Sequence, residues 1–310
     1  MRASLISIII PAFNCESTIE ETIYSVINQT IKNIEIIVIN NNSTDNTLNK
    51  VIKISDNRIK IYNCKKQSPA AARNLGIKYS SSDIIAFIDA DDIWFRNKLE
   101  KSLLALKKYD FVYHDLYIYK KKNFKFIYKG IAKTRLFSYP VKRDLILNGN
   151  GINTSSVVVK KSLLYKAGLF DENENLFAAE DYDLWIKISE YTESFKKIKE
   201  TLGKYIITGN NITNHQRRYT YTKELNRKYN SYLKKEFNSD MVPWMAYNLV
   251  IYGFKQKDFS KYYSYFKKVK FFKQDLRKKL ILTLIFLKYL LINLSNFLFI
   301  LKDHISKKFR

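Results

Sequence analysis

Three carboxylates stand within four positions at the end of an apolar run. Residues 84–88 have the length and composition of a buried strand, and Asp89, Asp91 and Asp92 follow at once. Open α/β sheets bind their ligands outside the carboxyl ends of such strands. Neighbouring carboxylates repel one another unless a cation holds them, and Asp oxygens suit Mg²⁺ or Mn²⁺ when substrate phosphates complete the coordination. Taken alone, the stretch supports equally a cation site and a strand followed by an acidic helix cap.

The elements before this stretch predict the fold that positions it. Apolar, β-branched runs at 5–10, 34–39 and 58–62 are typical of strands, and helical patterns follow at about 17–29, at about 47–55 and from 70 onward. Strands that alternate with helices at this spacing predict βαβ units with right-handed crossovers. We therefore expect an α/β fold with a mostly parallel central sheet flanked by helices.

The next hundred residues predict more β structure. Residues 110–130 are rich in Tyr, Phe and Lys and indicate one or two strands with a basic turn at 120–122. A β-like run follows at 153–160, and a short helix at 162–167 ends at Gly168.

Five segments resemble, in order, the motifs of family 2 glycosyltransferases of the GT-A fold, as found in bacterial surface-polysaccharide and lipooligosaccharide synthesis. They are residues 7–14, 40–47, 72–76, 87–92 and 180–185, the last resembling the family's Glu-Asp motif. The resemblance implies a GT-A domain at 1–218, with a nucleotide-sugar half at about 1–108 and an acceptor half at 109–218.

The resemblance also implies a nucleotide-sugar donor, a divalent Mn²⁺ or Mg²⁺ ion, and inversion at the anomeric carbon. Asp91 and Asp89 would hold the metal, Asp181 and Glu180 would be catalytic, and Asp181 would be the general base. A positioned carboxylate of this kind contributes about 10²–10⁴-fold to proton transfer. The residues that correspond to the family's nucleotide-sugar site are Pro11, Ala12, Phe13, Asn14, Glu16, Asn41, Arg73, Asp89 and Ala90.

Departures from the family pattern affect the expected nucleotide base of the donor and the expected ligands of the metal. Asn41 stands where the family usually has Asp; its oxygen can accept from uracil, but its amide can face cytosine instead. We expect a UDP-sugar, with the base less certain than usual. Ile206 and Thr208 stand where Arg and His are common. His215 is a candidate replacement ligand, although a lone His in a polar loop more often has no such role.

Asp181 has a plain structural interpretation as well. Leu184, Trp185 and Ile188 lie at helical spacing, so the acids at 180, 181 and 183 are also those that a helix dipole favours in a first turn. The preceding donor-type motifs make the catalytic interpretation the stronger one. Trp185 is expected to anchor the core and not to bind sugar.

The charge is distributed unevenly along the chain. The net charge is +25, but residues 1–100 hold 12 Lys or Arg against 11 Asp or Glu, so almost all of the excess lies beyond residue 100. This pattern favours a catalytic core joined to a part that meets an anionic surface. Two cysteines without metal-type spacing fit a reducing compartment. No nucleic-acid-binding signature is present, and nucleic acid is not expected as a partner.

Residues 219–310 predict a helical, basic and hydrophobic extension that associates with a membrane or oligomerises. Residues 280–301 are apolar almost all round, and leucines recur within them at alternating steps of four and three. Three arrangements stay open: a helix lying in an anionic membrane surface, which we favour, packing within the protein or a homo-oligomer, and a membrane span. Lys288 argues against an isolated span.

The sequence therefore predicts an inverting, metal-dependent glycosyltransferase that is cytoplasmic and peripheral to the inner membrane. Its acceptor would be a lipid-linked, lipooligosaccharide, O-antigen or capsule glycan. The alternative is a non-catalytic, membrane-bound partner that keeps the GT-A fold. The departures at Asn41, Ile206 and Thr208 motivate this alternative, and the retained Asp89, Asp91 and Asp181 argue against it.

Overall fold

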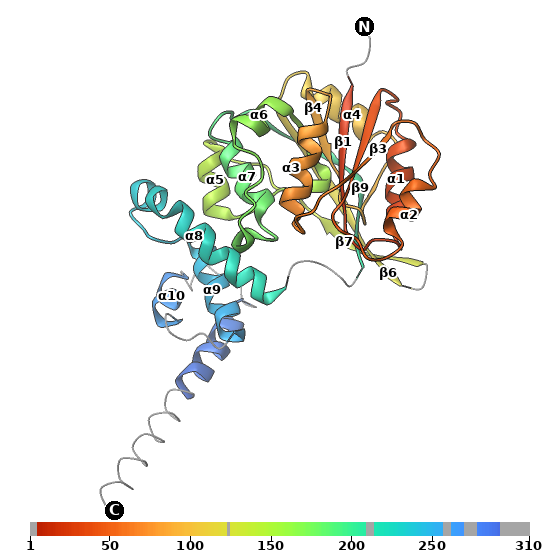
Figure 1. The fold of residues 1–310 in the computed structure, drawn as a ribbon. Helices are drawn as coiled ribbons and strands as arrows, with labels where there is room; N and C mark the ends of the chain where they lie inside the picture. Colours follow the sequence, from red (N-terminus) through yellow and green to blue (C-terminus); the bar gives the residue numbers. More distant parts are fainter. Residues whose placement is uncertain (1–4, 123–124, 209–213, 257–261, 270–277, 292–310) are drawn as a thin grey trace, which may run out of the picture. The chain divides into compact units, whose positions relative to one another are not determined.

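The structure is a computed structural model in which residues 5–122, 125–208, 214–256, 262–269 and 278–291 are described (Figure 1). The chain divides into two compact units, residues 1–214 and residues 215–310.

A mixed sheet forms the centre of the first unit. Within the described residues it has nine strands in the order β3-β2-β1-β4-β8-β6-β9-β5, and β7 pairs with β6. The strands are β1 (Ile6–Ala12), β2 (Ile34–Asn40), β3 (Ile59–Asn63), β4 (Ile84–Phe87), β5 (Ile93–Trp94), β6 (Phe111–Lys122), β7 (Lys125–Ala132), β8 (Val158–Lys160) and β9 (Phe195–Ile207).

The predicted α/β fold is confirmed, and its parallel part lies within the region predicted as the nucleotide-sugar half. Strands β3, β2, β1 and β4 are parallel neighbours, so their carboxyl ends share one edge. Beyond β4 the sheet is mixed, because β8 runs antiparallel to β4 and β6 while β9 is parallel to β6. Strand β6 extends to Lys122, so the basic residues predicted as a turn at 120–122 belong to the strand.

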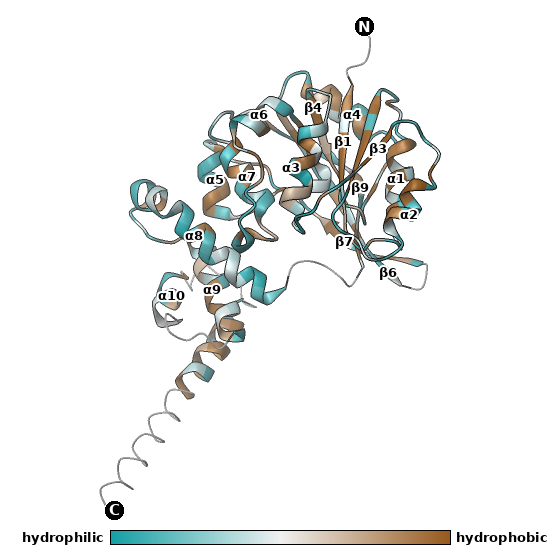
Figure 2. Cartoon of the chain, in the orientation of Figure 1, coloured by the Kyte–Doolittle hydropathy of each residue, from teal (hydrophilic) through white to brown (hydrophobic). Residues whose placement is uncertain are grey.

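Helices cover both faces of this sheet because successive residues point to opposite faces and the central strands carry apolar residues on both. Ile8, Ile10 and Ile36 pack toward α1, α2 and α4, whereas Ile37 and Ile39 pack toward α3. The buried strands are largely brown in Figure 2. The helices of the first unit are α1 (Ile19–Ile27), α2 (Thr47–Ile52), α3 (Pro69–Tyr79), α4 (Lys98–Leu106), α5 (Val141–Asn148), α6 (Lys161–Lys166) and α7 (Glu180–Ile188), with single 3₁₀ turns η1 (Thr154–Ser156) and η2 (Glu174–Leu176).

Helix α7 is fixed to the sheet by Trp185, which is fully buried as the sequence predicted. Its ring packs edge-on against Phe111 and Phe170, with ring centroids 4.9 and 6.1 Å away. Aromatic pairs in this geometry contribute about 0.5–1.5 kcal/mol beyond their buried area. The anchor sets the position of the acids in the first turn of α7.

The second unit is helical. It contains α8 (His215–Phe237), α9 (Pro243–Lys255), α10 (Tyr262–Lys268) and a further helix at 278–291. None of the helices in the described segments is both long and apolar enough to cross a membrane. The predicted apolar helix at 280–301 is described only to residue 291, and its remainder lies outside the described residues.

A tight approach of two strands holds the acidic loop after β4. Trp94 of β5 pairs with Gly203 of β9, and the N–H of Phe95 donates to the carbonyl of Leu202 over 3.0 Å. A Cβ at Gly203 would lie 2.6 Å from the carbonyl oxygen of Ile93, which is a backbone atom. The loop that carries Asp89, Asp91 and Asp92 is therefore held between β4 and this contact.

We expect Gly203→Ala to lower the free energy of unfolding by about 1–3 kcal/mol, because the added methyl must push β5 from β9. Urea denaturation followed by circular dichroism measures the change. An unaltered midpoint would show that β5 can shift without loss and is not a fixed support of the acidic loop.

Candidate functional site

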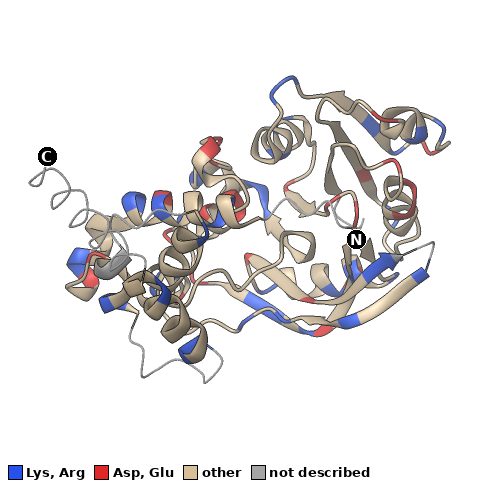
Figure 3. Ribbon diagram, turned by 90° about the horizontal axis from the view of Figure 1, so that it is seen from below, with Lys and Arg blue, Asp and Glu red and all other residues tan. Residues whose placement is uncertain are grey.

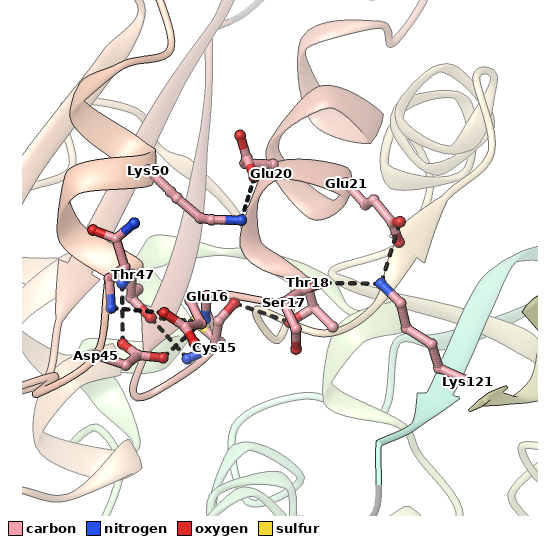
Figure 4. Close-up of polar contacts among 11 residues, drawn as sticks. Cys15, Glu16, Ser17, Thr18, Glu20, Glu21, Asp45, Thr47, Lys50 and Lys121 are labelled. Carbon is pink, nitrogen blue, oxygen red and sulfur yellow. Dashed lines mark hydrogen bonds and ion pairs between the residues drawn. The ribbon is translucent and has the colours of Figure 1, made fainter. Parts of the chain in front are cut away.

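Two loops at the carboxyl edge of the parallel strands are joined by hydrogen bonds. The N–H of Asn41, after β2, donates to the carbonyl of Ala12 at the end of β1 over 2.7 Å. The N–H of Cys15 donates to Thr47 Oγ1, and the N–H of Glu16 to Asp45 Oδ2 (Figure 4). The residues predicted for the nucleoside, from Pro11 to Glu16 and Asn41, thus lie in one connected structure.

The side chains in these loops divide into two groups. Asn14 Oδ1 accepts from the N–H of Thr44 at 2.8 Å, and Glu16 Oε2 accepts from the N–H of Asn46 at 2.9 Å, so both side chains shape the loops. Phe13, by contrast, is 45% exposed, and Asn41 Oδ1 is buried with no hydrogen-bond partner among the described residues. The exposed Phe13 ring and the buried Asn41 Oδ1 are therefore not occupied in joining the loops.

Arg73 joins the two halves of the site. Its guanidinium is buried and donates from Nη2 to Asp89 Oδ1 at 2.7 Å and from Nη1 to Glu180 Oε1 at 2.8 Å. Burial works against the charge, but Asp89 and Glu180 outweigh it and raise the pKa of Arg73 above its usual value. The resemblance implies that Arg73 belongs to the nucleotide-sugar site; the structure shows it between two carboxylates, 16 and 107 positions away.

The acids after β4 have three different surroundings. Asp89 accepts from Arg73, and the backbone N–H of Asp89 donates to Ser155 Oγ at 3.0 Å. Asp92 is buried and accepts from the N–H of Ile206 at 3.1 Å, which ties it to β9. Asp91 makes neither of these contacts, with Arg73 or with the N–H of Ile206. Burial, with Asp89 adding to it, raises the pKa of Asp91 to about 7.

Asp89 and Asp91 supply only part of the coordination that a divalent cation needs. Asp91 and the partly exposed Asp89 form an acidic edge where crowding raises the pKa of Asp91, and a cation relieves such repulsion. In the described part of the chain no group of three His, Cys, Asp or Glu side chains comes together as a metal site. An ion held by one or two carboxylates and completed by substrate phosphates needs no such group. Asp91 and Asp89 therefore fit a donor-bridged ion.

Asp181 meets a residue that the sequence analysis did not single out. Thr154 Oγ1, in the turn η1, donates to Asp181 Oδ2 at 2.7 Å, and the N–H of Tyr182 donates to Oδ1 at 2.6 Å. Burial, with Glu180 adding to it, raises the pKa of Asp181 to about 6 even though the Thr154 hydrogen bond lowers it. A carboxyl with this pKa is mostly ionised at pH 7 and can accept a proton.

The prediction of a β-like run over 153–160 was wrong in its first part. Residues 154–156 form η1, and the strand β8 begins only at Val158. This turn supplies Thr154 to Asp181 and Ser155 to Asp89, and the carbonyl of Ser155 accepts from the indole N–H of Trp94 at 2.7 Å. The cluster of small polar residues at 153–156 was the available signal.

His215 lies in the second unit, where it begins α8. Its ring stacks on Tyr252, with centroids 5.4 Å apart, and its Nε2 lies 2.8 Å from Lys255 Nζ. These contacts belong to the second unit, and the described residues give His215 no carboxylate partner for a metal.

The family model described as glycosyl transferase family 2 matches residues 7–166, more than half of the chain. The chain belongs to this family. It is 36% identical over 187 residues, 59% of this chain and 69% of its relative, to the Escherichia coli UDP-Glc:alpha-D-GlcNAc-diphosphoundecaprenol beta-1,3-glucosyltransferase WfgD. The fold resembles that of Staphylococcus aureus TarS 1–349 in complex with UDP-GlcNAc, with a TM-score of 0.57 at 17% identity, over 86% of this chain and 76% of that one.

A Rickettsia bellii glycosyltransferase without an assigned activity is 35% identical over 218 residues, or 69% of this chain. The match spans only 30% of that relative's length. Family membership and the GT-A-like fold are therefore shown, whereas the substrates of this member are a matter for proposal.

The bridge formed by Arg73 predicts a large loss of stability when Arg73 is replaced. In Arg73→Met the buried Glu180 and the partly exposed Asp89 lose their shared cation, and we expect the free energy of unfolding to fall by about 3–5 kcal/mol, chiefly because Glu180 is left unpaired. The free energy of unfolding of Arg73→Lys should lie between those of Arg73→Met and the wild type. The reason is that an ammonium keeps the charge but lacks the planar fork that donates to both carboxylates at once. Urea denaturation measures both.

The matched control is Arg58→Met. Arg58 forms a partly exposed pair with Asp56, and exposed pairs contribute about 0–1 kcal/mol. Equal losses at Arg73 and Arg58 would contradict a special role for the buried bridge.

The Thr154 hydrogen bond predicts a shift in pH dependence. A bond to the charged form lowers the pKa of Asp181, so Thr154→Val should raise that pKa by roughly one unit. If Asp181 is the base, kcat/KM of the wild type falls as pH drops through about 6, and the acidic limb of Thr154→Val moves to higher pH. Thr154→Ser keeps the hydroxyl and should keep the wild-type profile. An acidic limb that stays in place in Thr154→Val would assign the titration to another group.

Proposed function

We propose that this family member transfers a sugar from a nucleotide-sugar, a UDP-sugar by preference, to a hydroxyl of a lipid-linked glycan, with inversion at the anomeric carbon. The observation that carries the proposal is the Arg73 bridge, which brings the end of β4 and the first turn of α7 together. The bridge supports the proposal because Asp181, a carboxyl suited to act as a base, is the neighbour of Glu180 in this first turn.

The nucleotide would bind at the two joined loops. Phe13 offers an open ring face for the base, and Asn41 offers an amide whose oxygen has no other partner among the described residues. A buried polar atom without a partner costs free energy, and a ligand that supplies the missing hydrogen bond removes that cost. A UDP-sugar is supported further by the donor named for WfgD and by the UDP-GlcNAc complex of TarS.

The chemistry would be a single displacement. The acceptor oxygen forms a bond to the anomeric carbon as the bond from that carbon to the diphosphate breaks, and the hydroxyl proton passes to Asp181. A divalent ion held by Asp91 and Asp89 would neutralise charge on the leaving diphosphate when it is bound. Glu180, fixed by Arg73, would position the neighbouring Asp181 and leave its own Oε2, which is buried without a partner in the described structure, for a substrate hydroxyl.

The acceptor class follows from chemistry and from one relative. The acceptor named for WfgD is a sugar on a diphosphate-linked lipid, and such a molecule is held at a membrane. We propose a related acceptor of surface-glycan synthesis for this chain, used at the cytoplasmic face of the inner membrane. The basic second unit supports this location, because an anionic leaflet attracts clustered Lys and Arg.

Donor binding and hydrolysis test the proposal. With a panel of UDP-, GDP-, CMP- and dTDP-sugars, we expect one UDP-sugar to bind, more tightly with Mn²⁺ than without it. Asp91→Asn should lose the Mn²⁺-dependent part of binding. Asp181→Asn should keep binding, measured by calorimetry, but lose at least about 10²-fold in transfer.

Asp56→Asn is the control for loss of a carboxylate, because Asp56 pairs with Arg58 away from these loops. Failure of every donor to bind, in a folded protein, would overturn the enzymatic proposal and favour the non-catalytic partner.

A further inference from the structure

The helix at 278–291 presents a row of leucines to solvent. Four leucines spaced by four, three and four residues lie on one side of the helix. Each is at least half exposed; they are Leu280, Leu284, Leu287 and Leu291, with exposures of 60, 58, 51 and 65%. We call these four residues the leucine row.

The opposite side of the helix is the one that packs on the protein. Leu282 is fully buried, and Phe286 stacks on Phe266 of α10 with ring centroids 4.6 Å apart. Lys278 and Lys288 lie over the rings of Tyr247 and Phe254 of α9. The helix is therefore docked by one apolar face and keeps a second one outward, whereas a surface helix usually has a single apolar face. Figure 2 shows this helix largely brown.

The charge around the leucine row indicates what covers it. Residues 215–310 hold 22 Lys or Arg and 6 Asp or Glu, and the helix at 278–291 has three Lys and no acid. Of the acids in the described part, Glu224 already binds Arg227 and Asp240 binds Lys268. The unit thus carries a strong positive excess, visible as blue segments in Figure 3.

A second copy of the chain is the poorer occupant of this surface. Pairing two leucine rows would bring two positively charged units together. Paired helices usually select their partner through opposite charges beside the apolar seam. Lys279 and Lys288 flank the row on a helix that offers no acid in return. An anionic lipid surface supplies both the apolar layer and the negative charge.

We infer that the leucine row is the surface by which this protein inserts into an anionic lipid bilayer, with the surrounding lysines on the headgroups. The inference deepens the proposed function, because a lipid-linked acceptor lies in the same surface. Lipid binding is measured without donor or acceptor, so its failure and the failure of the glycosyltransferase proposal are separate results.

The test is co-sedimentation of the full chain with vesicles of phosphatidylcholine alone or mixed with phosphatidylglycerol. We expect binding to the mixed vesicles that weakens at high salt, because screening removes the attraction of the headgroups. Leu284→Gln/Leu291→Gln should lower the partition coefficient by roughly tenfold or more, because two side chains no longer leave water. Gln is a good helix former, so circular dichroism should show an unchanged fold.

The matched control is Leu104→Gln/Leu136→Gln, which removes two leucines of similar exposure, 67 and 62%, from the first unit. It should bind vesicles as the wild type does. Absence of wild-type binding, or equal binding by the row variant, would overturn the inference. A concentration-dependent dimer in sedimentation velocity that the row variant abolishes, without vesicle binding, would overturn it too and assign the row to a second copy.

Discussion

The buried guanidinium of Arg73 is the constraint on which the site depends. Two carboxylates, from the end of β4 and the start of α7, would repel each other at this separation without it. Removing an arginine from water is costly, and two charge-assisted hydrogen bonds, one to each carboxylate, offset that cost. Because one rigid fork holds both carboxylates, the donor edge and the acid pair of α7 cannot move independently.

The same interaction divides the acids by task. Asp89 and Glu180 share the single positive charge of Arg73, and Asp92 accepts from the backbone N–H of Ile206 in β9. Burial and the neighbouring acids raise the pKa of both Asp91 and Asp92, and burial raises the pKa of Asp181, which accepts a hydrogen bond from Thr154. Asp91 and Asp181 are the two groups to which the proposed function assigns a cation and a proton.

Local sequence patterns predicted the features whose residues are contiguous in the sequence. The β-branched runs of β1, β2 and β4 and the acids that follow β4 are contiguous, so hydrophobic period and spacing placed them correctly. The contact of Arg73 with Glu180 spans 107 positions, and no pattern of either segment encodes it. Likewise, the sequence marked Asn14 and Glu16 as nucleotide ligands from motif position alone, whereas the structure shows their side chains occupied in holding the loops together.

The turn η1 shows why the acceptor half is harder to predict than the donor half. Residues 154–156 are three small polar residues before a short strand, and their composition fits a strand start as well as a turn. Their importance comes from contacts on three sides: Asp181 of α7, Asp89 after β4 and Trp94 of β5. Tertiary packing therefore decides both their conformation and their role.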